Sequence, residues 1–417
     1  MKILLVHEFY QSNSPSGEDA MFRMERDLLQ RAGHEVATYE VHNDDIGATL
    51  ADRLRVAAAT PWSRSSRRAL TRVLERNRPE IAHFHNTFPL ISPSAFSACS
   101  DLGVPVVQTL HNYRLVCPGG LLQRDGHPCE QCVGRSPLPA IAHRCYRSSR
   151  AATTVAVTML LYNRLRGTYA HDVDRYVVLT EFGRRVLIRG GLPAEKLTVR
   201  PNGLTDDPGA GGGEGNFALY AGRLSAEKGA RTMIRAWHAV EGLPLVVAGD
   251  GDQRIALEEE ARQCGVDVRF IGQRPRAEIL SLMRSARIVV IPSECYEGLP
   301  VTYVEAMACG APVVASRLGA LAEILTDREN GAHFAPGNPA ELASAVNELI
   351  AQPDRVARIR LQNRRLFEER YSPTAALRSL EAIYRAVSTQ RKQAALTRSP
   401  QASREPLGTH EAGEDGS

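Results

Sequence analysis

Glu297-Gly-Leu-Pro-Val-Thr-Tyr-Val-Glu305 is the stretch that decides the fold of this chain. The apolar run at 286–292 predicts a buried strand just before it, and residues 301–309 predict a helix that Gly310 closes. A strand, a glycine turn and a helix N-terminus form a site for a phosphorylated ligand, because amide N–H groups and the helix dipole both point at the anion. The carboxylates of Glu297 and Glu305 suit hydroxyl groups on the sugars on either side of that phosphate.

The alternation of strand and helix extends in both directions from this stretch. In the first half an amphipathic helix is expected at 16–32, and strands are expected at 3–6, 35–39, 81–85, 104–110 and 176–179. A glycine-rich run at 204–215 is predicted to be a flexible linker or loop. The second half repeats the plan, with strands expected at 217–221, 244–248, 268–271, 288–291 and 312–315. Such crossovers predict an α/β fold of two doubly wound parallel sheets, with ligands bound in the cleft between them.

The length of the chain sets the expected domains, because 417 residues are too many for a single core. We expect an N-terminal Rossmann-like domain at 1–198 and a C-terminal Rossmann-like domain at 199–370. A helix at 371–388 should pack back toward the N-terminal domain. Residues 389–417 lack hydrophobic periodicity, so we expect a disordered tail there.

Composition indicates an ordinary globular protein. Apolar residues make up 43% of the chain and charged residues 24%, and the formal net charge of +4 is too small to indicate nucleic-acid binding. The first apolar run is too short for a signal peptide, and no run of 18 apolar residues occurs. We therefore expect a cytoplasmic protein, located at most at the inner face of the cytoplasmic membrane.

Arginines are concentrated in one part of the first half. Between Asp52 and Arg78 the cationic side chains are Arg53, Arg55, Arg64, Arg67, Arg68, Arg72, Arg76 and Arg78. A solvated helix face is one interpretation of this cluster. Contact with an anionic acceptor or with a membrane surface is the other.

Two cations follow the first strand of the second half. Gly222 ends that strand, and Arg223 and Lys228 lie in the loop behind it. They suit a diphosphate leaving group, because each charge-assisted hydrogen bond to phosphate contributes about 1.5–3 kcal/mol. Arg274 follows another strand at the same sheet edge, which suits contact with a base.

These elements, in this order, resemble the retaining glycosyltransferases of family 4, which have the GT-B fold of two Rossmann-like domains facing across a cleft. The resemblance covers nearly the whole chain up to about residue 388. The matching pieces are Gly-Arg-Leu-Ser-Ala-Glu-Lys-Gly at 222–229, Ala-Gly-Asp-Gly at 248–251, Phe-Ile-Gly at 270–272, Glu-Gly-Leu-Pro…Glu-Ala at 297–306, Ala-Cys-Gly-Ala-Pro-Val-Val-Ala at 308–315 and Arg-Pro-Asn-Gly at 200–203. Each piece is weakly specific by itself, whereas the ordered set is strongly specific.

The resemblance implies roles for the residues of the second domain. Arg223 and Lys228 would hold the donor diphosphate and stabilise its charge as the glycosidic bond breaks. Glu297 would hydrogen-bond hydroxyls of the transferred sugar, and Glu305 would hold the nucleotide ribose. The remaining donor contacts would come from Gly222, Arg274, Gly298 and Leu299.

The resemblance assigns the acceptor side to the first domain. Gly17 belongs to a loop that approaches the donor phosphate, although Ser16 stands where the family often has another glycine. His111, which follows a predicted strand, would face the transferred sugar. The sequence places no carboxylate of this domain as a nucleophile. A front-face retaining mechanism is therefore implied, in which the leaving phosphate takes the acceptor proton and no cofactor is required for catalysis.

The resemblance also implies the partners of this protein. The donor would be a UDP- or GDP-sugar. The acceptor would be a glycan or a lipid-linked molecule, as in the branch of family 4 that serves bacterial surface-polysaccharide synthesis, and no nucleic acid is expected.

An insertion at 113–145 carries four closely spaced cysteines, Cys117, Cys129, Cys132 and Cys145. The two-residue gap within Cys-Glu-Gln-Cys is typical of zinc sites, and a loop of this length needs something to order it. A structural zinc and simple reduced thiols both remain open, whereas disulfides are disfavoured in a cytosolic chain.

Three other functions fit the sequence less well than a glycosyltransferase. A nucleotide-sugar epimerase of the same fold would lack this Glu-Gly-Leu-Pro context. A catalytically silent subunit that only binds sugar nucleotides would not need Arg223, Lys228, Glu297 and Glu305 together. A zinc-dependent nucleic-acid binder would need more than one cysteine loop and a larger positive charge.

Overall fold

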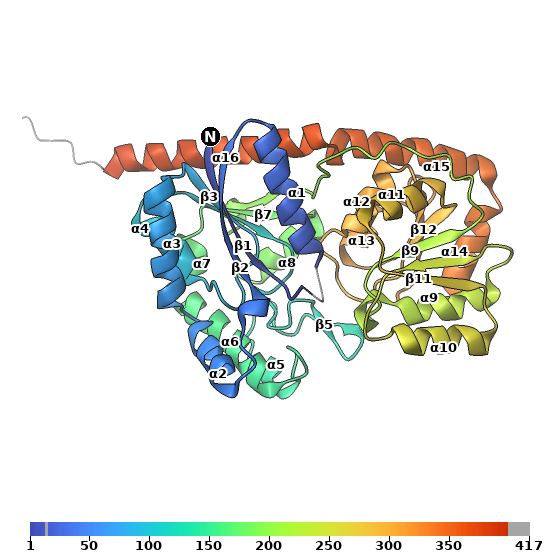
Figure 1. Cartoon of the computed structure of the whole chain (residues 1–417), viewed down its shortest axis with the longest axis horizontal. Helices are drawn as coiled ribbons and strands as arrows, with labels where there is room; N and C mark the ends of the chain where they lie inside the picture. The colour runs from blue at the N-terminus through green and yellow to red at the C-terminus, as the bar shows by residue number, and fades with distance from the viewer. Residues whose placement is uncertain (13–15, 399–417) are drawn as a thin grey trace, which may run out of the picture.

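The computed structural model describes residues 1–12 and 16–398. Figure 1 shows two α/β domains side by side, the first coloured blue to green and the second yellow-green to orange. A long red helix at the C-terminus lies across the first domain. None of the helices in the described residues is long and apolar enough to cross a membrane.

The first domain is built on a six-stranded parallel sheet in the order β2-β1-β3-β4-β7-β8. Its strands are β1 Lys2–Phe9, β2 Glu35–His42, β3 Ile81–Phe84, β4 Val106–Leu110, β7 Arg175–Val178 and β8 Leu197–Val199. Its helices are α1 Gly17–Arg31, α2 Leu50–Ala59, α3 Arg64–Asn77, α4 Ser94–Asp101, α5 Pro139–Ala142, α6 Arg150–Arg166, α7 Thr168–His171 and α8 Glu181–Arg189. A small hairpin of β5 Gln123–Arg124 and β6 His127–Pro128 lies in the cysteine loop.

The second domain repeats the plan with a six-stranded sheet in the order β11-β10-β9-β12-β13-β14. Its strands are β9 Ala218–Ala221, β10 Leu245–Ala248, β11 Val268–Gly272, β12 Ile288–Ile291, β13 Val313–Ser316 and β14 Gly331–Phe334. Its helices are α9 Ala230–Ala236, α10 Arg254–Cys264, α11 Arg276–Ser285, α12 Val301–Ala308, α13 Gly319–Ile324, α14 Pro339–Ile350 and α15 Pro353–Leu366. The prediction of two doubly wound parallel sheets is therefore confirmed.

The central strands are buried and mostly apolar because helices cover both faces of each sheet. In β12 and β13, for example, every residue is buried. Every strand predicted from the sequence is present, with shifted ends. Strands β8 and β14 and the hairpin strands β5 and β6 were not predicted, since none of them contains a run of four apolar residues.

Strand order reverses once in each sheet, and the reversal decides where a ligand can bind. In the second sheet it falls between β9 and β12, whose carboxyl ends lead into the loops of Arg223 and Glu297. In the first sheet it falls between β1 and β3. Loops leave in opposite directions at such a point and open a crevice, which is where ligands of doubly wound sheets bind.

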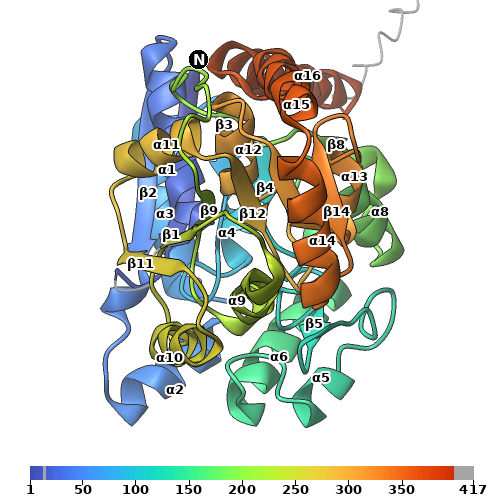
Figure 2. The ribbon, with the colours of Figure 1, turned by 90° about the vertical axis from the view of Figure 1, so that its right-hand side faces the viewer.

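The C-terminal helix α16 Pro373–Arg398 follows a π-helical turn at Phe367–Tyr371 and packs on the first domain. Its buried residues Leu380, Tyr384 and Val387 share a cluster with β1 and α1, including Leu5 and Phe22. Helix α16 therefore lies against the N-terminal domain (Figure 2 shows α16 above the strands of that domain).

The expected end of this helix at residue 388 is wrong, because α16 continues to Arg398. Gln390 and Arg391 hold it on the first domain through Arg175 and Asp174, with Arg391 Nε 2.6 Å from Asp174 Oδ1. Residues 399–417, the rest of the expected tail, lie outside the described residues.

The glycine-rich segment between the domains is held against the second domain. The Gly213 N–H donates to Arg284 O at 3.0 Å, and Arg360 Nη2 donates to both Gly211 O and Arg284 O at 2.9 Å. Of the two predicted alternatives, a flexible linker or a loop, the structure has a loop with defined contacts, because the Gly211 carbonyl accepts hydrogen bonds from the buried Arg360.

Candidate functional site

A large cleft of about 1120 Å³ lies at the switch point of the second sheet. Four residues predicted to bind the donor line it, namely Gly222, Arg223, Arg274 and Glu305. Gln11 and Arg147 from the first domain also line it, so both domains contribute to the cleft. Its volume reaches the upper end of the range of ligand pockets, which suits a nucleotide with a sugar attached.

Glu305 lies at one wall of the cleft, in the second turn of α12. Its side chain is 9% exposed, and Oε1 accepts a hydrogen bond of 2.7 Å from Arg276 Nε. Burial raises the pKa of Glu305, while Arg276 acts in the opposite direction. An acid held in place in this way offers its other carboxylate oxygen to a hydroxyl group in the cleft.

Arg223 and Arg274 border the same space with half-exposed guanidinium groups. Arg223 Nη2 donates to Glu227 Oε1 at 2.6 Å, and Arg274 Nε donates to Ile271 O at 2.9 Å. Arg223 Nε also donates to Ser225 Oγ at 3.3 Å, and Arg274 Nε lies 3.8 Å from Glu278 Oε1. Each guanidinium still has further N–H donors for an anion or a base.

Lys228 and Glu297 form an ion pair beyond this cleft. Lys228 Nζ lies 2.6 Å from Glu297 Oε1, and Ser293 Oγ donates to the same oxygen at 2.6 Å. Burial lowers the pKa of Lys228, but Glu297 and its neighbours outweigh that effect and raise the pKa above its usual value. Gly229, at φ +67°, makes the turn after Lys228 where a Cβ would meet Pro292 O, so the loop requires glycine.

The first domain touches the Glu297 loop directly. A Cβ on Gly298 would lie 2.9 Å from His111 O, so no other residue fits there without a shift. Tyr113 Oη donates to Glu297 O at 3.2 Å, and Asn202 Nδ2 donates to Leu299 O at 3.3 Å. These contacts bring His111, Glu297, Gly298 and Leu299 together, as expected for the sugar end of a donor site.

Gly17 begins α1, where Ser16 caps the helix by accepting from the Asp19 N–H. A Cβ on Gly17 would make an ordinary contact at 3.7 Å with Val301 Cγ2, so the N-terminus of α1 lies against that of α12. Gly17 is therefore near the expected place. Its loop includes residues 13–15, which lie outside the described residues.

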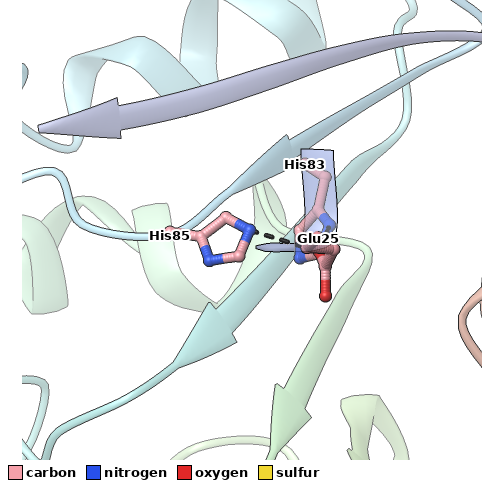
Figure 3. Close-up of side chains that lie close together, drawn as sticks. All are labelled: Glu25, His83 and His85. Carbon is pink, nitrogen blue, oxygen red and sulfur yellow. Dashed lines mark ion pairs between the residues drawn. The ribbon is translucent and has the colours of Figure 1, made fainter. Parts of the chain in front are cut away.

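A buried histidine network supports His111 from behind. His85 Nδ1 and His111 Nε2 are 2.9 Å apart, and the two rings stack. Figure 3 shows Glu25 against His83 and His85, with Glu25 Oε1 3.0 Å from His83 Nδ1 and 3.2 Å from His85 Nε2. The contact from Glu25 to His85 is not aligned as a hydrogen bond.

Burial and neighbouring charges set the protonation states of the residues in this network. Burial alone would raise the pKa of Glu25, but Arg200 at 2.7 Å and the two histidines hold it well below its usual value. Burial lowers the pKa of His85, and burial together with His85 holds that of His111 well below its usual value. The network therefore contains an ionised glutamate and the neutral imidazole of His111, a residue whose own carbonyl lies beside Gly298.

Glu25, His83 and His85 also have candidate ligand atoms within 4.8 Å of one another. The guanidinium of Arg200 already occupies the other carboxylate oxygen of Glu25, and His83 Nδ1 contacts Tyr384 Oη at 2.7 Å. A cation bound there would face Arg200 directly, so this arrangement suits an internal ion pair better than a metal site.

Sequence reasoning missed several residues that complete the site. Ser293 fixes Glu297, Arg276 fixes Glu305, and His85 supports His111. Ser293 follows the end of β12, so its position at the sheet edge was readable. The roles of Arg276 and His85 depend on side-chain directions across different elements, which spacing along the chain does not reveal.

The cysteines of the insertion also come together. Cys117, Cys129, Cys132 and Cys145 line one small cavity together with His143. All eight cysteines of the chain are among the described residues, and each is a free thiol.

Comparison with known proteins identifies the family. The model described as "Glycosyltransferase Family 4" matches residues 26–207, and the model "Glycosyl transferases group 1" matches residues 208–366. An uncharacterized glycosyltransferase of Methanocaldococcus jannaschii is 37% identical over 163 residues, which are 38% of this chain and 40% of that protein. The 2-deoxystreptamine glucosyltransferase of Streptomyces kanamyceticus is 30% identical over 262 residues, which are 60% of this chain and 63% of that protein.

The matches thus span less than two thirds of these relatives' own lengths. Among solved structures, an Anabaena protein in complex with UDP superposes with a TM-score of 0.64 at 20% identity, over 92% of this chain and 99% of that one. Its fold and the family matches agree with the two facing Rossmann-like domains. This chain belongs to the group 1 glycosyl transferases of glycosyltransferase family 4 and has the GT-B fold.

Proposed function

We propose that this protein is a retaining glycosyltransferase that moves a sugar from a nucleoside-diphosphate sugar to a glycan or lipid-linked acceptor. The observation that carries the proposal is the continuity of the site. Two groups of residues lie around the same crevice at the domain boundary. One is the nucleotide-sized cleft with Arg223 and Glu305. The other is the Lys228–Glu297 pair beside His111. A catalytically silent subunit or an epimerase of the same fold is the alternative.

The donor is proposed to be a UDP- or GDP-sugar that lies with its nucleotide in the cleft. Glu305 would hydrogen-bond the ribose, and Arg274 would contact the base at the far wall. The Anabaena protein of the same fold was solved with UDP, which supports this class of donor. The sugar would then extend toward Glu297 and the backbone of Gly298.

The proposed chemistry depends on charge that develops on the leaving diphosphate. Arg223 and Lys228 would turn from their carboxylate partners toward the phosphates and stabilise the negative charge as the glycosidic bond breaks. The acceptor oxygen attacks the anomeric carbon from the face the diphosphate leaves. Its proton passes to a phosphate oxygen, so configuration is retained and no cofactor takes part.

His111 is proposed to accept a hydrogen bond from the transferred sugar. A proton on His85 Nε2 is favoured because that nitrogen faces the ionised Glu25. His85 Nδ1 then accepts from His111 Nε2–H, which leaves Nδ1 of His111 as an acceptor. The network would thus fix one tautomer of the cleft histidine.

The acceptor is proposed to reach the site from a membrane surface. Helices α2 and α6 pack together and expose Leu50 (72%), Leu54 (61%) and Leu165 (89%), with Arg53, Arg55 and Arg166 also exposed. Apolar side chains among arginines suit the interface of an anionic bilayer. This surface lies on the first domain, which carries the acceptor side.

The first test combines donor turnover with product stereochemistry. The full chain should release nucleoside diphosphate from one or more members of a panel of UDP-, GDP- and ADP-sugars. NMR of the product should show the anomeric configuration of the donor. An inverted product would refute the retaining mechanism, and binding without release would favour the silent subunit.

Glu297→Gln should lower kcat on the order of 100-fold, because it removes a charge that pairs with Lys228 and that would contact the transferred sugar. Glu294→Gln is the matched control in the same loop. The Glu294 Oε1 atom accepts from Thr232 Oγ1 at 2.6 Å, and glutamine keeps that contact. Steady-state kinetics should separate the two variants, and equal activities would contradict the role of Glu297.

His85→Phe should lower kcat by about 5- to 150-fold, the equivalent of the roughly 1–3 kcal/mol at stake when a buried hydrogen-bonding group loses its partner. His83→Phe is the control for loss of a buried histidine beside Glu25, because His83 contacts Glu25, Thr109 and Tyr384 but does not contact His111. Both variants are assayed below their unfolding temperatures. If kcat falls equally in both, His85 acts through stability and does not position His111.

Vesicle binding tests the membrane surface. The full chain should co-sediment with vesicles rich in anionic phospholipid, and serine at positions 50, 54 and 165 should abolish that binding. Leu361→Ser alters a leucine that is 70% exposed on α15 and should change nothing. Undiminished sedimentation of the triple variant would exclude this surface.

A further inference from the structure

We propose that Cys117, Cys129, Cys132 and Cys145 bind one zinc ion, which holds the 113–145 loop against the donor site. Nothing in the glycosyltransferase chemistry requires this ion. The ion would therefore serve the structure of the acceptor-side loop.

Convergence of the four thiols is the first observation. They come from three separate parts of the loop, around residues 117, 129–132 and 145, and all line one cavity with His143. The remaining cysteines Cys99, Cys264, Cys295 and Cys309 lie outside the residues that line it. Thiols that meet from distant turns are the arrangement that a closed tetrahedral zinc site needs.

The backbone brings these turns close together. A Cβ on Gly119 would lie 2.8 Å from Cys145 O, so the turn after Cys117 is pressed against the last cysteine. The Gly120 N–H donates to Cys117 O at 2.9 Å, and the Cys129 N–H donates to Leu122 O at 2.7 Å. Each cysteine thus sits in or beside a tight turn rather than in a long helix or strand.

Tyr113, Val116, Cys117 and Leu122 pack into the core of the first domain. The stretch 123–136, which carries Cys129 and Cys132, contains no buried residue and so lacks a core to order it. The regular structure of the loop amounts to the two-residue strands of the hairpin and the four-residue helix α5. Of the eight non-glycine residues with positive φ in the described chain, Leu122, Asp125, Arg144, Arg147 and Ser148 lie at 122–148. Such conformations cost free energy and persist where surrounding contacts hold the backbone in place. A zinc ion with four ligands would supply such contacts.

The ion would complete its own coordination shell on binding. The four sulfur atoms share a cavity but are not all within 4.8 Å of one another. Within the described residues, that criterion is met by Glu25, His83 and His85. Zinc would draw the thiolates to about 2.3 Å from itself and leave no open position, so its role would be structural.

The loop reaches the donor side through two hydrogen bonds and is tied to α8 of its own domain by an ion pair. Gln123 Nε2 donates to Glu294 O at 3.1 Å and Tyr113 Oη to Glu297 O at 3.2 Å. Glu130 pairs with Arg189 of α8 at 2.8 Å. A loop fixed by zinc would therefore hold the backbone of the Glu297 segment from the first-domain side.

Metal analysis of the full chain, purified under reducing conditions without a metal-affinity step, tests the site. We expect one zinc per chain in the wild-type protein and in Cys264→Ser, whose thiol lies in α10 of the second domain. The double variant Cys129→Ser, Cys132→Ser should lose the zinc. Zinc-free wild-type protein, iron in place of zinc, or zinc retained by the double variant would each overturn the proposal.

A second measurement keeps the test valid if the double variant does not fold. Titration of native wild-type protein with a mercurial thiol reagent should release zinc, detected by a chromophoric chelator. Hydrogen exchange within 113–145 should then rise, while exchange in the strands of both sheets stays unchanged. A disulfide among the four cysteines, or release without change in that loop, would refute the role. Because these readouts do not require turnover, they stand or fall independently of the proposed function.

Discussion

The arrangement of the two domains depends on the ion pair between Arg200 and Glu25. Both side chains are 3% exposed, and Arg200 Nη1 donates to Glu25 Oε2 at 2.7 Å. Arg200 also donates to Ala376 O in α16, so it joins the chain crossing between the domains to α1 and to the C-terminal helix. Breaking a buried pair leaves an uncompensated charge, so these three segments must remain together. The same glutamate faces His83 and His85, and the contact that orders the domain junction therefore also supports the histidine at the cleft.

The site exists because two switch points face each other across that junction. Neither sheet alone presents both the carboxyl end of β12 and the loop after β4 to one ligand. Gly298 shows how closely the domains approach, since its Cα lies against the carbonyl of His111 without room for a side chain. A doubly wound sheet offers a crevice at its carboxyl edge, and pairing two of them encloses it.

Much of this could be read from the sequence, for identifiable reasons. The long apolar runs such as Ile288–Ile291 predict buried strands, and Gly222, Arg223, Glu297 and Glu305 follow strand ends, where position along the chain fixes position at the sheet edge. The sequence did not predict the pairing of Glu305 with Arg276 or the support of His111 by His85. Those contacts join different elements through side-chain directions. The extension of α16 beyond 388 was missed because its polar residues gain their order from Asp174 and Arg175, which are distant in the chain.

The charges of the proposed donor site are arranged to suit an incoming diphosphate. Each cation already has an acidic partner, Arg223 with Glu227 and Lys228 with Glu297. The site is therefore close to neutral when empty, and no cation is buried without compensation. In the proposed function, an incoming diphosphate would exchange partners instead of entering an array of unpaired charges. Lys228 would turn to the phosphate and release Glu297 to hydroxyl groups of the sugar, so that the two halves of one ion pair would recognise the two ends of the donor. Recognition of the sugar and neutralisation of the leaving group would thereby be coupled, and a nucleotide without its sugar would leave the Glu297 carboxylate with Ser293 Oγ but without a compensating cation.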